Sequence, residues 1–367
     1  MRIGLERGGG ARLVIDDGRI SDADGKPDLL LSIGDATVLP GLINAHDHLY
    51  RNHYPRLGAP PYTDAYAWGI DIHERCSAVI ERAQAISRRD ALLFGAFKNI
   101  LGGVTTVVHH DAWHETLDDA AFPVRLARVR VLHSLGFERN VAEAARAPVD
   151  APLCIHLAEG TNERAAEEIE VLASHGLLNE RLLAVHVLGV DAAGVTRLRD
   201  ANAAVVWCPT SNHFLFGRTA PQALFASGID TLVGTDSLLT GAGTLLDELR
   251  AAHAHACLDA ERLLAAVGVT AARRLGLAPP SLSTGAAADI IVMRAPLLEA
   301  RPAHVALVMV GGRPVLADGS LAEVFAASGV AAEPIIVGGM GKVVAAPLAT
   351  IAQRVFDLSP DCARIVA

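Results

Sequence analysis

Two histidines separated by one residue stand at the end of an apolar segment near the start of the chain. His46 and His48 close the run Leu39–His48. Alternate residues of a β-strand point to the same face, so both imidazoles would project to one side at the carboxyl end of the strand. Two converging imidazoles are typical ligands of a divalent transition metal. The alternative is a pair of hydrogen-bonded polar histidines at a strand end.

Three later apolar segments end in residues of the same chemical kind. These residues are His156 with Glu159, His186, and Asp236. Four of the seven strands that we expect in this region therefore end in metal-binding or acid–base groups. In a (β/α)8 barrel, catalytic residues come from the carboxyl ends of several strands. We therefore expect these side chains to meet at one mouth.

The residue types indicate the chemistry. Three neutral imidazoles and one carboxylate can hold a divalent cation and leave a position for water. Such a metal lowers the pKa of water from about 15.7 to near 7. A nearby carboxylate can take the proton and deliver it to a leaving nitrogen, while another imidazole orients the hydroxide or polarises the attacked group. The residues predict hydrolysis of a carbon–nitrogen or similar bond, and they leave open whether His186 is a ligand or a helper.

The elements that must position these side chains alternate between strand and helix. We expect strands at 41–46, 104–110, 129–135, 153–157, 182–187, 203–208 and 231–235. We expect helices at 76–101, 117–127, 162–175, 191–201, 219–227, 244–257 and 259–275. Several of these strands are almost wholly apolar, as strands covered on both faces are. The alternation predicts βα units around a parallel sheet.

Both ends of the chain show a different pattern, because we expect mainly short strands and turns before residue 41 and after Pro280. The simplest packing pairs the two ends. We therefore expect a composite β-sandwich of residues 1–40 and 281–367 beside a catalytic barrel of residues 41–280.

The composition argues against several classes of protein. The chain of 367 residues has 41 acidic against 32 basic side chains and a formal charge of -9, which argues against a nucleic-acid binder. Its five cysteines are scattered and form no paired pattern, so we expect a reducing, cytoplasmic location. The sequence has no apolar run of membrane-spanning length, and it has no phosphate-binding glycine motif or serine-nucleophile elbow. A homo-oligomer remains open.

In these positions the sequence resembles the amidohydrolase superfamily, in the branch of cytosine and guanine deaminases and triazine hydrolases. The matching segments run in the family's order along residues 1–320 and are Pro40–His48, Gly103–Val108, His156–Glu159, Trp207–Asn212, Gly234–Ser237 and Gly285–Val292. Together they are specific, whereas each alone is weak. The resemblance implies a (β/α)8 barrel of the TIM type, distorted or abbreviated, with a small β-sandwich.

The resemblance also implies roles for single residues. The implied metal ligands are His46, His48, His156 and Asp236. Glu159 would be the proton shuttle, His186 would stand beside the metal water or the substrate, and Asp236 would also take part in activating the water. The implied cofactor is one divalent ion, zinc first, with iron and manganese as alternatives that accept the same nitrogen and oxygen donors.

Lysine is scarce, and this bears on the number of metals. The three lysines of the chain are Lys26, Lys98 and Lys342. Binuclear members of the superfamily bridge two metals with a carboxylated lysine on a strand in the middle of the barrel. Lys98 falls in a predicted helix, and no lysine stands between it and Lys342. We therefore expect one metal, and a carboxylate bridge through Glu159 is the less favoured route to two.

The chain departs from the family pattern between Gly136 and Leu153, where only about sixteen residues lie. Related enzymes usually fit a helix, a strand and a helix there. Either a short strand is hidden within Phe137–Pro148, or the barrel has seven strands. Since this region often supplies substrate contacts in the family, the gap leaves the substrate open.

Further candidates for substrate contacts lie in the connections after the strands. They are His109, His110, Trp113, Asn212, His213 and Ser237. A polar surface loop or a turn cap is the alternative for these residues. All four tyrosines stand in the connection 50–68, which predicts a lid or a pocket wall, with a packed loop or an oligomer contact as the alternative.

The expected protein is a metal-dependent hydrolase of carbon–nitrogen bonds other than peptide bonds, acting on a small nitrogen heterocycle or cyclic amide. Deamination of an aminated heterocycle comes first. Ring opening of a cyclic amide, as in imidazolonepropionase-like relatives, and a triazine-type chlorohydrolase are alternatives. A non-hydrolytic barrel, such as a decarboxylase or an isomerase, or a ligand-binding protein is the alternative of another class.

Overall fold

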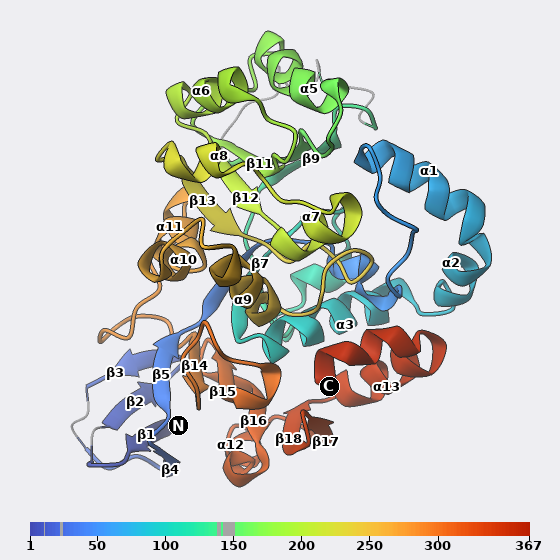
Figure 1. Ribbon diagram of the computed structural model, residues 1–367. Helices are drawn as coiled ribbons and strands as arrows, with labels where there is room; N and C mark the ends of the chain where they lie inside the picture. Colours follow the sequence, from blue (N-terminus) through green and yellow to red (C-terminus); the bar gives the residue numbers. More distant parts are fainter. Residues whose placement is uncertain (11, 23–24, 138–140, 142–150) are drawn as a thin grey trace.

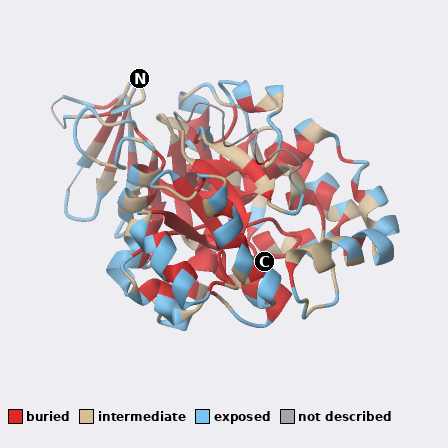
Figure 2. Ribbon diagram, turned by 90° about the horizontal axis from the view of Figure 1, so that it is seen from above, coloured by how far each residue is buried: buried red, intermediate tan, exposed pale blue. Residues whose placement is uncertain are grey.

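The computed structural model describes residues 1–10, 12–22, 25–137, 141 and 151–367. Figure 1 shows an α/β part that carries most of the helices and, at the opposite side of the molecule, two further sheets built from the ends of the chain. Figure 2 shows that buried residues concentrate in the central strands, while the outer faces of the helices are exposed. In the described residues, no helix is both long and apolar enough to cross a membrane.

Two parallel sheets form the α/β part. The first has the order β6–β7–β8, with strands Leu42–Asp47, Val104–His109 and Arg125–Leu126. The second has the order β13–β12–β11–β10–β9, with strands Asp230–Val233, Ala204–Trp207, Leu182–His186, Leu153–Leu157 and Arg130–Ser134. All seven expected strands are present within two residues at each end.

The two sheets are joined at both edges. On one side only residues 127–129 separate β8 from β9, so a single stretch of chain pairs first with β7 and then with β10. On the other side the backbone N–H groups of Thr235 and Asp236 donate to the carbonyl of His46 at 2.9 and 3.2 Å. A Cβ at Gly234 would lie 2.7 Å from that of His46, so only glycine allows this approach. The expected fold class, a distorted α/β barrel, is confirmed.

Helices cover the outer faces of these strands (Figure 1). The helices that follow the sequence expectation are α3 Arg88–Leu101, α5 Glu163–Ser174, α6 Ala192–Asp200, α8 Gln222–Ala226, α9 Leu245–His255, α10 Ala260–Ala266 and α11 Val269–Arg274. Between the strands and helices, apolar side chains such as Leu153, Leu172 and Leu249 form one continuous core.

Several helical segments differ from the expectation, and one of them, the helix expected at 259–275, is divided into α10 and α11. The helix expected at 76–101 is divided into α2, Ser77–Ala83, and α3, because Ser87 caps a new helix by accepting a hydrogen bond from the Asp90 N–H. The helix expected at 117–127 is wrong: the segment holds the short helix η2, Glu115–Asp118, and then β8. Pro123 lies inside that range and would break a helix. Helices α1, Ala65–Arg75, and α7, Pro209–Phe216, were not expected.

Two further sheets come from the chain ends. One has the order β3–β2–β1–β4, with strands Arg19–Ser21, Arg12–Asp16, Arg2–Arg7 and Leu29–Gly34. The other has the order β17–β18–β16–β15–β14–β5, with strands Ala332–Val337, Met340–Ala345, Arg313–Asp318, Val305–Val310, Ile290–Met293 and Thr37–Pro40. Strand β5 pairs antiparallel with β14, so the two chain ends share one sheet. The domain boundaries at 40 and 281 remain a prediction.

The last residues return to the barrel. Helix α13, Leu348–Leu358, packs on α3, and the Phe356 and Phe94 rings lie 5.9 Å apart. The remaining short helices are η1 Leu49–His53, η3 Pro302–His304, η4 Gly319–Leu321, α12 Glu323–Ala327 and η5 Pro360–Val366. The question of a hidden strand within Phe137–Pro148 falls mainly on 138–140 and 142–150, which lie outside the described residues.

Candidate metal centre and active site

Three imidazoles from two strands converge at the carboxyl end of the barrel. His46 lies near the end of β6 with His48 just after it, and His156 lies near the end of β10. The Nε2 atom of His156 is 3.2 Å from Nε2 of His48 and 3.3 Å from Nε2 of His46. All three side chains are buried. The structure therefore brings together three of the four residues that the sequence singles out as metal ligands.

The partners on the far side of two rings decide which nitrogen faces this group. Nδ1 of His156 lies 2.6 Å from the carbonyl oxygen of His133 and donates to it. Nδ1 of His48 lies 3.2 Å from Oδ2 of Asp111, whose other oxygen is 2.7 Å from the Arg51 guanidinium. A neutral ring protonated at Nδ1 keeps its lone pair at Nε2. The Nε2 lone pair of His156 therefore points toward Nε2 of His48 and of His46, at a place where a cation could accept it.

The same burial keeps these rings uncharged. Desolvation is the largest cause that holds the pKa of His46, His48 and His156 well below the ordinary value of 6.5. Neutral imidazole is the form of histidine that binds a metal. The protonation state at neutral pH therefore suits the three rings to ligation.

Asp236 adds a carboxylate to the group from the loop after β13. Its Oδ1 atom lies 3.6 Å from Nε2 of His48, and its Oδ2 atom accepts hydrogen bonds from the Ser211 and Thr240 hydroxyls, each at 2.8 Å. Burial by itself raises the pKa of this carboxyl, but His48, His186 and the two hydroxyls outweigh burial and lower it to about 2. The side chain is therefore ionised at neutral pH and presents an anionic oxygen to the imidazoles.

Glu159 and His186 stand together beside this group. Nε2 of His186 is 3.5 Å from Oε1 of Glu159, and Nδ1 of His186 donates to Oδ1 of Asn212 at 2.8 Å. Burial, with a further contribution from Asp236, raises the pKa of Glu159 well above 4.5. Burial also lowers the pKa of His186. The pair combines a carboxyl group that binds a proton more tightly than an ordinary glutamate with an imidazole whose Nε2 can accept a hydrogen bond.

The backbone is strained where these side chains leave the strands. His186, the last residue of β11, has φ 71°, and Asp236 has φ 53°. Ala158, between His156 and Glu159, has φ 51°. Residues other than glycine seldom adopt this left-handed conformation, which concentrates at functional sites. The strain marks this mouth as the functional end of the barrel.

A cavity of about 680 Å³ opens over the site. Its floor contains His48, His156, Glu159, Asp236 and Ser237. Its apolar wall is contributed by Tyr50, Tyr54, Leu57, Trp68, Ile70, Ile72, Ile80, Phe137 and Leu239. Five more polar residues line it: Arg51, His73, Glu74, Gln84 and His133. Much of the wall comes from the connection 50–68, where the sequence predicts a lid or pocket wall.

The remaining sequence candidates take different places. Ser237 lines the cavity, whereas Trp113 is 40% exposed and packs against Arg128, whose guanidinium lies 3.7 Å from the ring centre. His213 is exposed and is not among the residues that line the cavity. Asn212 lies behind His186 and contacts that ring. The structure thus gives Asn212 a contact with His186, where a contact with substrate was expected.

His109 and His110 are both buried below the mouth. Nδ1 of His109 accepts a hydrogen bond from the Leu49 N–H at 3.3 Å, which anchors the start of η1. The ring of His110 lies 4.3 Å from that of His156, centre to centre. Neither residue is among those that line the cavity, so the cavity does not support the prediction that they contact the substrate directly.

Sequence reasoning missed three residues around the metal group. His133 lines the cavity and supports His156, and Asp111 contacts His48. His133 is the fourth of the five residues of β9. The search for histidines near the carboxyl ends of apolar strands, which identified the other histidines, could therefore have found it. Asp111 carries a weaker signal, because it lies two residues after the end of β7.

The third missed residue is Lys98, which forms a buried ion pair beneath the site. Its Nζ atom lies 3.0 Å from Oδ2 of Asp47, the residue between the two histidines of β6. It also donates to Oγ1 of Thr235 at 2.9 Å and to the backbone carbonyl of Asp236 at 3.0 Å. The Asp47 carboxylate accepts a further hydrogen bond from Asn99 at 2.6 Å. One ammonium group therefore ties both ligand-bearing segments to α3.

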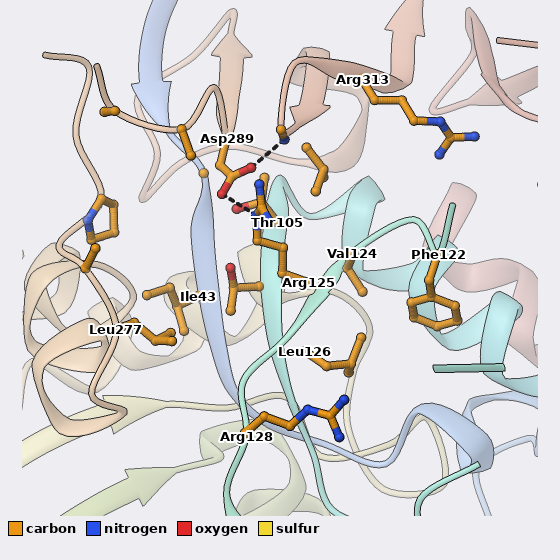
Figure 3. Close-up of a pocket in the computed structure, with 18 of the residues that line it drawn as sticks. Ile43, Thr105, Phe122, Val124, Arg125, Leu126, Arg128, Leu277, Asp289 and Arg313 are labelled. Atoms are coloured by element: carbon orange, nitrogen blue, oxygen red, sulfur yellow. Dashed lines mark hydrogen bonds and ion pairs between the residues drawn. The ribbon is translucent and has the colours of Figure 1, made fainter. Parts of the chain in front are cut away.

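A larger cavity, about 780 Å³, lies at the amino ends of the same strands (Figure 3). Its lining includes Gly41 and Thr105, at the starts of β6 and β7. Asp289 accepts from Arg125 at 2.7 Å and from the Gly311 N–H at 2.6 Å. None of the candidate catalytic or metal-binding residues lines this cavity. Because the amino-terminal face of such barrels serves stability, we place the chemistry at the other mouth.

Comparison with known proteins gives independent results. The sequence model described as the amidohydrolase family matches residues 136–315. The chain is 26% identical to a 5-methylthioadenosine/S-adenosylhomocysteine deaminase of Pyrococcus furiosus over 402 aligned residues, covering 85% of this chain and 92% of the relative. It is 30% identical to an S-triazine hydrolase of Gordonia rubripertincta over 147 residues, covering 37% of this chain and 31% of the relative.

The fold also matches a solved structure. An adenosine deaminase from Xanthomonas campestris with bound zinc superimposes with a TM-score of 0.67 and 20% sequence identity. The superposition covers 89% of this chain and 96% of the other. This similarity supports the overall architecture.

Proposed function

We propose that this chain, of which residues 136–315 match the amidohydrolase family model, is a metal-dependent hydrolase that deaminates an aminated nitrogen heterocycle. The observation that carries the proposal is the convergence of three imidazole Nε2 atoms and one carboxylate beneath a cavity, with Glu159 and His186 beside them. A relative named as a deaminase, aligned over 85% of the chain, supports a carbon–nitrogen bond as the target.

We assign the metal to a set of three neutral nitrogens and one anionic oxygen, from His46, His48, His156 and Asp236. The donor set fits such an ion, because the Nδ1 hydrogen bond of His156 leaves its Nε2 lone pair directed at the Nε2 atoms of His46 and His48. The set carries a charge of about -1, suited to one divalent cation, with zinc first and iron or manganese as alternatives. When bound, the ion lowers the pKa of water to near 7 and so supplies a nucleophile at neutral pH.

Glu159 moves the proton. Its carboxyl group lines the cavity, and its pKa, raised by burial, makes it a better proton acceptor than an ordinary glutamate. Deamination adds water to the ring carbon that bears the amino group, and that amino nitrogen must gain a proton to leave as ammonia. Glu159 takes the proton from the water, delivers it to the leaving nitrogen and returns to its starting state.

His186 orients the reacting groups. Its Nδ1–H group donates a hydrogen bond to Oδ1 of Asn212, which fixes the tautomer of the ring. The Nε2 lone pair therefore lies on the side of Glu159. A neutral imidazole in this position accepts a hydrogen bond from the attacking water and holds it in line with the carboxyl group. The lowered pKa of His186 keeps the ring in this neutral form.

A second candidate reaction is hydrolytic displacement of a substituent from a triazine-type ring. The similarity to an S-triazine hydrolase over 147 residues favours it, and the mostly apolar cavity wall would accept alkyl substituents. The attack by water is the same in both reactions. They differ in the group that leaves, so product analysis separates them.

The proposal is tested by a substrate screen and by matched variants. Aminated purines, pyrimidines and triazines, cyclic ureas and N-acyl compounds are incubated with the protein while ammonia and ring absorbance are followed. Glu159→Gln should keep its metal and lose about 10²–10⁴-fold in rate, because a proton-transfer group is removed. Glu163→Gln, an exposed carboxylate on α5, is the control and should behave as wild type.

Metal analysis tests the ligand assignment separately. His46→Ala and Asp236→Ala should each lower the metal content of the purified protein. Unchanged metal in both variants would refute the site, and full activity in Glu159→Gln would refute the proton shuttle. Turnover of none of the compounds by a metal-loaded protein would favour a non-hydrolytic or ligand-binding barrel.

A further inference from the structure

A second group of metal-type side chains lies deeper in the barrel, and two of its three members have no role in the proposed reaction. It consists of His110, which follows β7, Cys154, the second residue of β10, and His46. Each offers one ligand atom, and these atoms all lie within 4.8 Å of one another. All three side chains are buried. Cys154 precedes His156 by two residues, so it lies on the same face of the strand and closer to the barrel interior.

The ring of His110 is already oriented as a ligand. Its Nε2 atom lies 3.0 Å from the carbonyl oxygen of Leu132. Because a carbonyl only accepts, Nε2 carries the proton, and the lone pair stands at Nδ1. That Nδ1 atom lies 3.3 Å from Sγ of Cys154. The Cys154 thiol donates to this lone pair, so a metal ion that binds both residues takes the place of the thiol proton. A histidine that donates one nitrogen to a carbonyl and has its lone pair at the other nitrogen is oriented as metal ligands usually are.

His46 supplies the second observation. Its Nδ1 atom is buried and has no hydrogen-bond partner within the described part of the chain. A buried polar atom without a partner costs free energy and calls for a physical explanation, of which an absent ion is one. The unpaired nitrogen therefore points to a ligand in the same region as the His110–Cys154 pair.

We propose that His46, His110 and Cys154 form a second metal site, for a thiophilic divalent ion such as Zn²⁺ or Cd²⁺. Two imidazoles and one thiolate are donors that such ions prefer, and three protein donors leave a position for another ligand. On binding, the S–H bond of Cys154 breaks, the sulfur keeps the electron pair and shares it with the ion, and the proton leaves to solvent.

The second site is inhibitory, because His46 belongs to both groups. A neutral imidazole has one lone pair, so an ion in the deep site that takes His46 removes a donor from the catalytic metal group. Excess Zn²⁺ or Cd²⁺ should therefore slow hydrolysis, and Cys154 should govern that effect. Cys154 and His110 do not line the cavity, which separates this effect from competition with substrate.

The test adds Cd²⁺ to the purified holoenzyme and records the near-ultraviolet absorption of the cadmium–thiolate bond. Wild type should develop this band to one equivalent per chain, and Cys154→Ser should lose that equivalent. Cys208→Ser, which removes another buried thiol of the barrel core, should keep it. His48→Ala, which disables only the catalytic group, should keep the band as well. Cys154→Ala repeats the measurement with a second substitution.

Two results would overturn the proposal: no band in wild type, or an undiminished band in both Cys154 variants. The band needs no turnover, so a failure of the proposed function would leave this measurement intact. With a substrate in hand, the Cd²⁺ concentration that halves the rate should rise at least about tenfold in Cys154→Ser and stay unchanged in Cys208→Ser. Equal inhibition of both variants would also count against the site.

Discussion

Replacing Lys98 by methionine should destabilise the fold and weaken metal binding at the same time. The lysine is fully buried, and its Nζ atom lies 3.0 Å from Oδ2 of Asp47. Methionine fills most of the same volume without the charge. The variant leaves Asp47 as a buried carboxylate without its cation, and it removes a donor from the hydroxyl of Thr235 and from the carbonyl of Asp236.

The expected size follows from what Asp47 retains. Removing one partner of a buried ion pair costs about 3–5 kcal/mol. The Asp47 carboxylate keeps amide donors from Asn44, Asn52 and Asn99 at 3.2, 2.8 and 2.6 Å. These hold the loss near the lower end, at about 3 kcal/mol. Because Lys98 positions both ligand-bearing segments, we expect metal affinity to fall about 10–100-fold, as when an outer partner of a ligand is lost.

Urea unfolding followed by tryptophan fluorescence measures the free energy of unfolding, and competition with a chelator measures metal affinity. Lys342→Met is the matched control. Its Nζ atom is also buried and lies 2.6 Å from Oδ1 of Asp318, but in the sheet from the chain ends. It should destabilise the fold and leave metal affinity unchanged. The exposed Lys26→Met should change stability by no more than about 0.5 kcal/mol.

The coupling between the two charges can be measured directly. In the double variant Asp47→Asn with Lys98→Met, the loss should be smaller than the sum of the two single losses by about 1–3 kcal/mol. The reasoning is refuted if Lys98→Met unfolds within about 1 kcal/mol of wild type. It is also refuted if Lys342→Met lowers metal affinity as much as Lys98→Met does.

Three further predictions concern single side chains. Burial raises the pKa of Glu248 to about 8, although hydrogen bonds from Thr210 act in the opposite direction. Between about pH 4.5 and 8, the folded state therefore keeps a proton on Glu248 that the unfolded state has released. Stability should therefore fall as pH rises through this window, by at most about 5 kcal/mol, and Glu248→Gln should flatten the fall in urea unfolding at pH 5 and pH 8; parallel curves would contradict this. Asn212→Leu leaves the Nδ1 proton of His186 without an acceptor. The rate should drop about 10–100-fold at unchanged metal content, and a wild-type rate would show that Asn212 does not orient the ring. Asp111→Ala removes the carboxylate at His48 and should lower metal affinity about 10–100-fold, so metal retention equal to wild type against a chelator would argue against the contact.

The sequence by itself determined the fold class and the chemistry of one barrel mouth. Alternation along a strand is a local property, so the spacing of His46 and His48 placed two imidazoles on one side before any tertiary contact was known. Apolar strands that end in polar residues indicated a shared mouth in the same way. The scarcity of lysine also argued for one metal, and two of the three lysines turn out to be buried in ion pairs.

Only the tertiary structure decided what surrounds these residues. Asp47 and Lys98 are separated in the chain by η1, α1 and α2, and no periodicity pairs them. The same holds for His110 and Cys154, which meet only because β7 and β10 face the same barrel interior. Closure of a barrel depends on packing between segments that are distant in the sequence. The free energy of that packing cannot be read from a local sequence pattern. Local spacing therefore predicts which side chains can do chemistry, and packing decides which partners set their charge and orientation.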